Sequence, residues 1–281
     1  MIVLGAEELK LAEYTLKELF PESLKVYGSL FNINRGKPHN LEVIADSWPD
    51  FKVIICKPRQ QSQQGPRDRE GDFNIHHIYS KDKESLQKLL GVCGVINWRR
   101  FTLLAGLDIK HVDAVKEHAC CNGTPTKTEA IMFVLMLQDA SHLMQLQSDV
   151  TGRVVPLTPA HAELINSTWK YGGDRSSFNS VLSYISNYPS LCVLGEEGRP
   201  VSWLLLYQHS ALGLLYTLPE YRHRGYARLL VTTMARRLLD DGRPVYCFVE
   251  EGNTLSYRLF TSLGFRHKSD HRAVWFQLNP R

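Results

Sequence analysis

A short basic loop between two regular elements constrains this chain more than any other feature. Residues 222–227 read Arg-His-Arg-Gly-Tyr-Ala and follow the apolar run 214–218, which predicts a strand. They precede 229–239, whose apolar spacing predicts a helix. The first N–H groups of a helix lack internal partners and carry about half a positive charge. Because Gly225 and Ala227 leave room beside the backbone, this junction predicts a phosphate-binding site.

Two motifs, taken together, resemble the GCN5-related N-acyltransferase superfamily. The Arg-x-x-Gly-x-Ala pattern at 222–227 resembles the loop that holds the pyrophosphate of acyl-CoA in that superfamily. Further along, 253–265 resembles its Asn-x-x-Ala-x-x-Leu-Tyr-x-x-x-Gly-Phe helix. A solvated basic turn is the alternative for the first motif alone, and the second motif, in the right order and spacing, argues against it.

The composition limits the classes of protein to which the chain can belong. The chain has 281 residues, enough for two ordinary domains, and its 43% apolar content can build packed cores. No apolar run approaches the ~20 residues that cross a bilayer, so we expect no membrane span. The net charge of +4 is mild and fits an anionic small ligand better than a nucleic-acid surface. We therefore expect no nucleic-acid partner.

Cysteine spacing argues against metal and disulfide chemistry. The six cysteines form neither a Cys-x-x-Cys pattern nor a paired zinc pattern, so no metal site is predicted. Cys56, Cys192 and Cys247 lie in apolar runs and are predicted to be buried. The pattern fits a reducing compartment. The N-terminal stretch lacks a secretory apolar segment, and its glutamates argue against a typical transit peptide.

The first half of the chain predicts alternating helices and strands. Helices are predicted at 6–19, 80–90 and 108–120, strands at 26–32, 51–56, 74–79 and 131–136, a short element at 43–44, and an exposed loop at 60–71. The polar stretch 138–152 predicts a domain boundary. We therefore divide the chain into an N-terminal domain, 1–145, and a C-terminal domain, 152–281.

The second half predicts a more specific order of elements. Strands are predicted at 154–157, 191–194, 201–207, 212–218, 244–249 and 273–278, and helices at 158–169, 176–187, 229–239 and 253–263. The order β-α-α-β-β-β-α-β-α-β is that of the GCN5-related N-acyltransferase fold. The predicted class is therefore α/β (α+β), with this fold in the C-terminal half. The mixed α/β N-terminal domain has an element order compatible with a degenerate copy.

Long strings elsewhere resemble the glycine N-acyltransferase family. One is Asn-Ser-Thr-Trp-Lys-Tyr-Gly-Gly at 166–173. The others are 20–28, 32–38, 46–51, 200–203 and 216–222. The match covers nearly the whole length and is weakest over 58–145, and the chain is similar to the glycine N-acyltransferase-like paralogues.

This resemblance implies transfer of an acyl group from acyl-CoA, a co-substrate, to the amine of a small amino acid by direct attack. The acceptor is glycine in the founding enzyme and glutamine in one paralogue. No permanently bound cofactor is implied. A mitochondrial location is implied, with the cytoplasm as the alternative, and we expect a monomer.

The motif positions also imply where acyl-CoA binds. The pyrophosphate contacts, the backbone contacts of the strand and the pantetheine contacts are Leu215, Tyr216, Thr217, Leu218, Arg222, Arg224, Gly225, Tyr226, Ala227, Asn253, Tyr257 and Phe260. In many superfamily members a tyrosine protonates the departing thiolate. Phe260 occupies that position here, with Tyr257 one turn earlier. The thiol of CoA has a pKa near that of free cysteine, about 8.5, so it can leave without an acid.

The base is the main departure from the family. The glutamate that is thought to act as base in the founding enzyme corresponds to Ala211 here. His209, Glu250 and Glu251 are the candidate substitutes, and a water-mediated base stays open. The plainer alternative is that His209 belongs to an ordinary hairpin and the two glutamates to a solvated turn.

The acceptor side is predicted from a Gly-containing stretch after a helix. Trp169 is expected to cover the site, and Lys170 or Arg175 to hold the acceptor carboxylate. The alternative is a C-capped helix end with Trp169 in the core. Ala211 keeps a second function open, an acyl-CoA-binding or regulatory protein with weak catalysis. A peptide N-acetyltransferase is a third, and the N-terminal domain argues against it.

Overall fold

The computed structural model describes residues 1–59, 74–144 and 153–280. The predicted loop 60–71 lies outside these ranges, as does part of the predicted boundary segment 138–152. In the described ranges, no helix is both long and apolar enough to cross a membrane.

The N-terminal half differs from its prediction at one helix and two strands, the first of which, at residues 2–3, was not predicted. Its elements are β1 (Ile2–Val3), α1 (Ala6–Lys17), α2 (Leu24–Asn34), β2 (Leu41–Ala45), β3 (Val53–Pro58), β4 (Ile75–Ser80), α3 (Lys83–Leu90), β5 (Thr102–Asp108), α4 (Val112–Cys121) and β6 (Thr126–Leu137). The predicted strand 26–32 is wrong, because it forms the middle of α2. Every residue of 24–32 is buried, and an apolar run buried on all sides does not distinguish helix from strand. Strand β5 was not predicted.

The C-terminal half has the predicted order of elements. It contains β7 (Arg153–Val155), α5 (Ala162–Thr168), α6 (Arg175–Asn187), β8 (Ser190–Leu194), β9 (Pro200–Leu206), β10 (Leu212–Thr217), α7 (Tyr226–Asp240), β11 (Val245–Glu250), α8 (Thr254–Ser262) and β12 (Arg266–Leu278). The last strand begins at Arg266 rather than at the predicted residue 273, because its polar first part pairs with β6.

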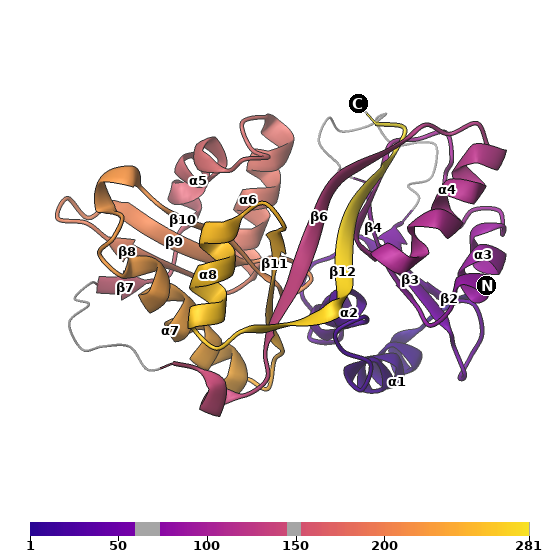
Figure 1. Ribbon diagram of the computed structural model, residues 1–281, viewed down its shortest axis with the longest axis horizontal. Helices are drawn as coiled ribbons and strands as arrows, with labels where there is room; N and C mark the ends of the chain where they lie inside the picture. Colours follow the sequence, from indigo (N-terminus) through magenta and orange to yellow (C-terminus); the bar gives the residue numbers. More distant parts are fainter. Residues whose placement is uncertain (60–73, 145–152, 281) are drawn as a thin grey trace.

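One continuous sheet joins the two halves. The strand order is β1-β2-β3-β4-β5-β12-β6-β11-β10-β9-β8-β7. The final strands are exchanged, because β6 of the first half pairs with β11 of the second, and β12 of the second pairs with β5 of the first. These two long strands lie side by side at the centre of the molecule (Figure 1). The predicted division at 145–152 stays a prediction, since each half completes its sheet with a strand of the other.

The order of elements is the same in both halves. Each runs β-α-α-β-β-β-α-β-α-β, and each contains one parallel pair, β4–β5 in the first half and β10–β11 in the second. The sheet order is symmetric about the β12–β6 pair. A degenerate copy would produce this repetition, and common descent of the halves stays a prediction.

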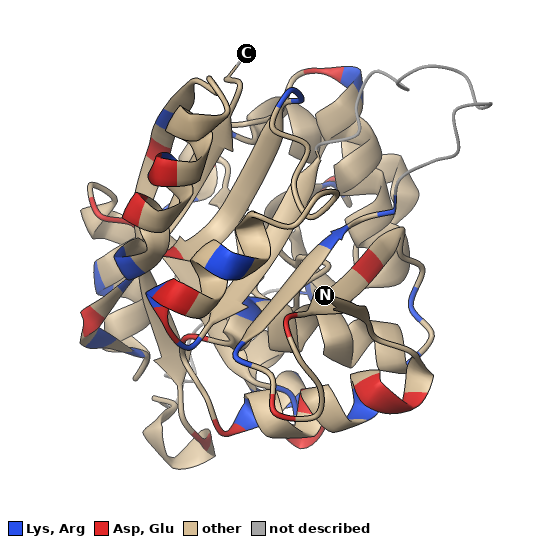
Figure 2. Ribbon diagram, turned by 90° about the vertical axis from the view of Figure 1, so that its right-hand side faces the viewer, with Lys and Arg blue, Asp and Glu red and all other residues tan. Residues whose placement is uncertain are grey.

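Apolar packing joins the two halves. Large apolar clusters fill each half, and a smaller one, which includes Leu24, Ala211 and Tyr246, joins them. The Tyr246 hydroxyl donates to the carbonyl of Leu24 in α2, at 3.2 Å, and also contacts the carbonyl of His209. On the face shown in Figure 2, basic and acidic residues are interspersed on helices and loops.

Candidate active site

The parallel strands β10 and β11 diverge and leave a cavity between them. They pair at only one position, Leu212 with Cys247. Beyond it the register of β10 shifts between Gly213 and Tyr216, and Leu214 adopts a left-handed backbone with φ 49°. Such a conformation costs a non-glycine residue energy and turns backbone groups out of the ladder. A cavity of about 380 Å³ opens here, a size typical of small-molecule sites.

The predicted phosphate loop stands at the start of α7, the helix that follows β10. Gly225 is the residue before the helix, has a left-handed backbone with φ 79°, and provides no side-chain cap. The Arg222 Nε donates to the carbonyl of Thr217 at 3.2 Å, and Arg224 donates to that of Glu220 at 3.4 Å. Both guanidinium groups are thus held by carbonyl oxygens of their own loop and keep their charge for an anion.

The strand that enters this loop exposes alternate backbone groups. The N–H of Leu218 donates to Val201 of β9 at 2.9 Å, which corrects the prediction that it contacts the pantetheine arm. The carbonyl of Thr217 instead accepts from Arg222. Because consecutive residues of a strand point their N–H groups to opposite sides, we expect the N–H of Thr217 to point away from β9.

The Asn helix supplies the other wall. Asn253 caps α8 by accepting from the N–H of Ser256 at 3.1 Å, and both residues line the cavity. Phe260 lines it too and is buried. The hydroxyl of Tyr257 is bonded to Nδ1 of His267 at 2.9 Å, outside the cavity lining. Tyr257 is therefore not placed to protonate a thiolate in this structure.

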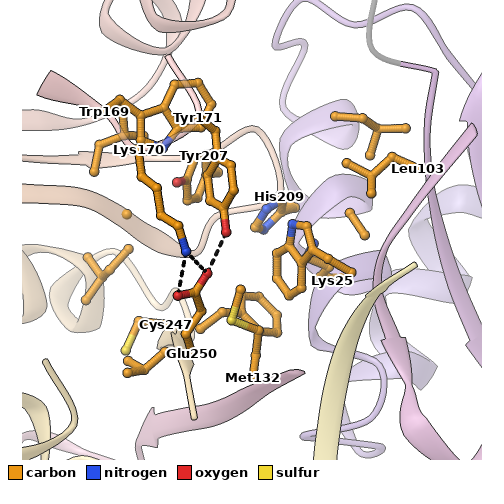
Figure 3. Close-up of a pocket in the computed structure, with 18 of the residues that line it drawn as sticks. Lys25, Leu103, Met132, Trp169, Lys170, Tyr171, Tyr207, His209, Cys247 and Glu250 are labelled. Atoms are coloured by element: carbon orange, nitrogen blue, oxygen red, sulfur yellow. Dashed lines mark hydrogen bonds and ion pairs between the residues drawn. The ribbon is translucent and has the colours of Figure 1, made fainter. Parts of the chain in front are cut away.

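Glu250 forms an ion-pair cluster at one side of the cavity (Figure 3). The Nζ of Lys170 lies 2.6 Å and 2.8 Å from its two carboxylate oxygens, and the Tyr171 hydroxyl donates to Oε1 at 2.5 Å. These hydrogen bonds, that of Lys170 first, lower the pKa of Glu250. A carboxylate stabilised in this way is a weak base. The cluster instead ties the segment after α5 to the end of β11.

Two of the other predicted residues lie away from the cavity. Glu251 points elsewhere and pairs with Nε of Arg272 at 2.8 Å. Arg175 begins α6 and does not line the cavity, so its predicted contact with an acceptor carboxylate is not supported by its position. Trp169, in contrast, lines the cavity next to Lys170.

His209 lies in the cavity wall and is almost fully buried, with 6% of its surface exposed. Burial, and then the neighbouring Lys25 and His77, lower its pKa well below the ordinary histidine value. Within the described ranges its Nδ1 has no hydrogen-bond partner. The lowered pKa keeps the ring uncharged near neutral pH, and its Nδ1 is enclosed by the protein.

Lys25 and His77 are cavity residues that sequence reasoning missed. Lys25 lies on α2 and His77 on β4, both in the half that was not expected to form the site. One signal was present: Lys25 is a charged residue inside an otherwise apolar run. Nothing in the sequence linked that run to residues nearly two hundred positions away.

Ala211, at which the resemblance implied a base, is fully buried and packs in the small apolar cluster with Leu24, Met132 and Tyr246. It does not line the cavity. The three cysteines predicted to be buried, Cys56, Cys192 and Cys247, are buried. Among the described residues, no group of three or more His, Cys, Asp or Glu side chains could hold a metal ion.

Comparison with known proteins gives one consistent family. The family model described as aralkyl acyl-CoA:amino acid N-acyltransferase matches residues 1–189, and the model of its C-terminal region matches 191–279. Glycine N-acyltransferase of Rattus norvegicus is 32% identical over 92% of both chains. Glycine N-phenylacetyltransferase of Bos taurus is 30% identical over 98% of this chain and 97% of that one.

Solved structures show the same fold over the full length. An X-ray structure of a Drosophila protein covers 99% of both chains with a TM-score of 0.80 at 17% identity. A tandem GNAT protein from the clavulanic acid biosynthesis pathway covers 100% of this chain and 98% of its own, with a TM-score of 0.53 at 12% identity.

Proposed function

The chain belongs to the aralkyl acyl-CoA:amino acid N-acyltransferase family, and on this premise we propose that it acylates the amine of glycine, with glutamine as the alternative acceptor. Acyl transfer from acyl-CoA to an amino acid is the activity of the family. One observation carries the assignment to this site. The diverging pair β10–β11 opens a cavity whose neighbour, the start of α7, offers uncapped N–H groups and two arginines.

The donor is proposed to lie across these two features. The pyrophosphate binds at Gly225 and its flanking arginines, where the helix N-terminus adds positive potential. The pantetheine arm runs between β10 and β11. The thioester carbonyl then reaches the irregular part of β10, where backbone N–H groups that leave the ladder can stabilise the developing oxyanion.

Transfer is proposed as a single direct attack. The amine nitrogen of the acceptor forms a bond to the thioester carbon, and the bond from that carbon to sulfur breaks. The departing thiolate has a conjugate acid of pKa about 8.5, so no residue is needed to protonate it. The amine must lose one proton, which requires a base close to the carbonyl.

We assign this base to His209 rather than to Glu250 or Glu251. His209 lines the cavity, and burial holds its pKa well below the ordinary histidine value, so the ring is uncharged near neutral pH. Glu250 is held as a carboxylate by Lys170 and Tyr171, and Glu251 is paired with Arg272 outside the cavity. The proton therefore passes from the acceptor amine to a ring nitrogen of His209 and then to solvent.

The direct test is product formation. The protein is incubated with acetyl-, benzoyl- or oleoyl-CoA and a panel of amino acids, thiol release is followed, and conjugates are identified by mass spectrometry. We expect an acylglycine or acylglutamine. Tight binding of CoA with no conjugate from any pair would contradict the proposal.

Such a result would favour the second candidate, an acyl-CoA-binding or regulatory protein. The observation behind it is Ala211, whose buried, apolar surroundings hold no carboxylate at the position of the family's base. A catalytic rate that disappears in a His209→Asn variant would argue against this candidate, because it would show that another base has replaced the missing one.

The proposal also includes a subcellular location and an oligomeric state. We place the protein in mitochondria, on its similarity to glycine N-acyltransferases, with the cytoplasm as the alternative. Subcellular fractionation of cells that express it distinguishes the two. We propose a monomer, and light scattering during size-exclusion chromatography would reveal a dimer.

A further inference from the structure

Three basic side chains from both halves of the chain meet at the inner wall of the cavity. Lys25 comes from α2, His77 from β4, and His209 from the turn after β9. We call them the basic cluster. They are buried, with 4%, 1% and 6% of their surfaces exposed. Lys25 and His209 lie beside each other on the far side of the cavity from Lys170 (Figure 3).

The basic cluster has no acidic partner in the described part of the chain. The Nζ of Lys25 lies over aromatic rings, 4.0 Å from the centre of Trp275 and 4.9 Å from that of Phe248. His77 is bonded through Nδ1 to the hydroxyl of Ser29 at 2.9 Å, and its Nε2 is unpartnered. Buried charges normally pair, so this arrangement is costly unless an anion enters.

The acids that line the cavity do not fill this role. Glu250 is paired with Lys170, and Glu129 lies 2.8 Å from Nζ of Lys127. Burial lowers the pKa values of Lys25, His77 and His209, and Lys25 lowers those of both histidines further. The three side chains therefore carry less positive charge than they would in water. A carboxylate that enters the cavity would favour their protonated forms.

The backbone is shaped to hold Lys25 in place. Gly106 of β5 has φ 72°, and a Cβ at that position would approach Cδ of Lys25 to 2.5 Å. The lysine stem thus lies directly against a glycine that no other residue can replace without displacement. A buried lysine that is packed, supported and unpaired in a cavity has the features of a built anion site.

We propose that Lys25, the lysine of the basic cluster, binds the carboxylate of the acceptor amino acid. This rests on the proposed function. In an α-amino acid a single carbon separates amine and carboxylate, so one small molecule can present its amine to His209 and its carboxylate to Lys25. The assignment replaces Lys170 and Arg175, since the first is paired with Glu250 and the second lies outside the cavity.

Kinetics with two acceptors test the proposal. Glycinamide keeps the amine of glycine and lacks the carboxylate. The assays are run at a pH above the acid limb of kcat of both proteins. In Lys25→Met we expect the KM for glycine to rise about tenfold or more, while the KM for acyl-CoA and the ratio kcat/KM for glycinamide stay within about twofold. An unchanged preference for glycine over glycinamide would overturn the proposal.

Lys57→Met is the matched control. Lys57 is a buried lysine too, but it lies outside the cavity and contacts the carbonyl of Gly94 and the carboxylate of Glu42. We expect it to leave the preference for glycine unchanged. Gly106→Ala, which displaces Lys25 without removing it, should lower that preference as Lys25→Met does.

Calorimetry separates this inference from the proposed function. Glycine is titrated into the protein saturated with CoA, in two buffers of different ionisation enthalpy. The inference predicts binding with proton uptake by the wild type, and weaker binding without that uptake by Lys25→Met. This readout holds even if no acceptor is acylated. Glycine that fails to bind, or that binds both proteins equally, would overturn the inference.

Discussion

The two parallel strand pairs occupy equivalent places in the two halves, but the helices that follow them begin differently. In the C-terminal half, β10–β11 keeps one paired position and leads to a helix whose first residue is preceded by left-handed Gly225. In the N-terminal half, β4–β5 keeps two paired positions, and Asp82 caps the following helix by accepting the N–H of Ser85.

This difference explains why one half is suited to bind the donor. The Asp82 carboxylate places a negative charge at the helix start where a phosphate would otherwise lie. The C-terminal half leaves that place open and surrounds it with arginines. The N-terminal half contributes Lys25 and His77 to the shared cavity instead. On the proposed assignments, the same order of elements supplies donor contacts in one half and acceptor contacts in the other.

The largest expected effect comes from filling the open helix start. In Gly225→Val, a branched side chain at φ 79° is strained and obstructs the approach of a phosphate. We expect the affinity for CoA, measured by calorimetry, to fall about hundredfold or more. Gly242→Val, at the opposite end of α7 with φ 67° and open space around it, is the control and should retain CoA binding. Equal affinities for CoA in the two variants would contradict the proposal that the start of α7 binds the donor.

The next largest effect is expected at His209, which lies in the cavity beside residues of the N-terminal half. His209→Asn should lower kcat about 10²- to 10⁴-fold without changing the affinity for CoA, because only proton transfer is lost. A smaller loss, or an equal loss of CoA affinity, would argue against a role as base.

The pH dependence of the same step has a defined sign. The lowered pKa of His209 means that the ring stays neutral as the pH falls, so the acid limb of kcat should lie well below pH 6.5. In Lys25→Met the repulsion from Lys25 is lost, and this limb should move to higher pH. A limb that does not move would show that the two side chains are not coupled.

A smaller effect is expected at the capped helix of the N-terminal half. Asp82→Ala removes the cap of α3 and should lower the denaturant concentration at the midpoint of unfolding. The affinity for CoA should not change. A second equivalent of bound CoA in this variant would mean that Asp82 alone prevents the N-terminal half from binding the donor.

The smallest effect is expected at the exposed ion pair. Lys170 is about two-thirds exposed, so Glu250→Gln should change stability by less than about 1 kcal/mol. The segment that follows α5 should nevertheless exchange its amide hydrogens faster, because its contact with β11 is weakened. Unchanged exchange there would show that Glu250 does not hold this segment.

Local signals in the sequence predicted the helices and strands around the proposed donor site. The spacing around Gly225 and Asn253 depends on residues that are close in the chain, and glycine, helix-cap and strand patterns are visible over such short distances. The acceptor side depends on distant contacts. Lys25 lies in a helix that was predicted as a strand, and only the packing of α2 against the second half brings it to His209.

The exchange of β6 and β12 was not predictable for a related reason. Both segments read as strands, and β12 was recognised only in its apolar last part, since its polar beginning lacks a hydrophobic pattern. Which strand pairs with which is decided by register over more than a hundred positions, and periodicity carries no information about that choice.

The exchanged strands also determine the order in which the sheet can form during synthesis. During synthesis β5 and β6 emerge long before β12, which must later insert between them. Until the last residues leave the ribosome, two strand edges of the first half therefore lack their partner and are open to incorrect pairing. A chain cut between the halves should recover its structure only when both fragments are present, as in a split reporter. We therefore expect the molecule to behave as one folding unit.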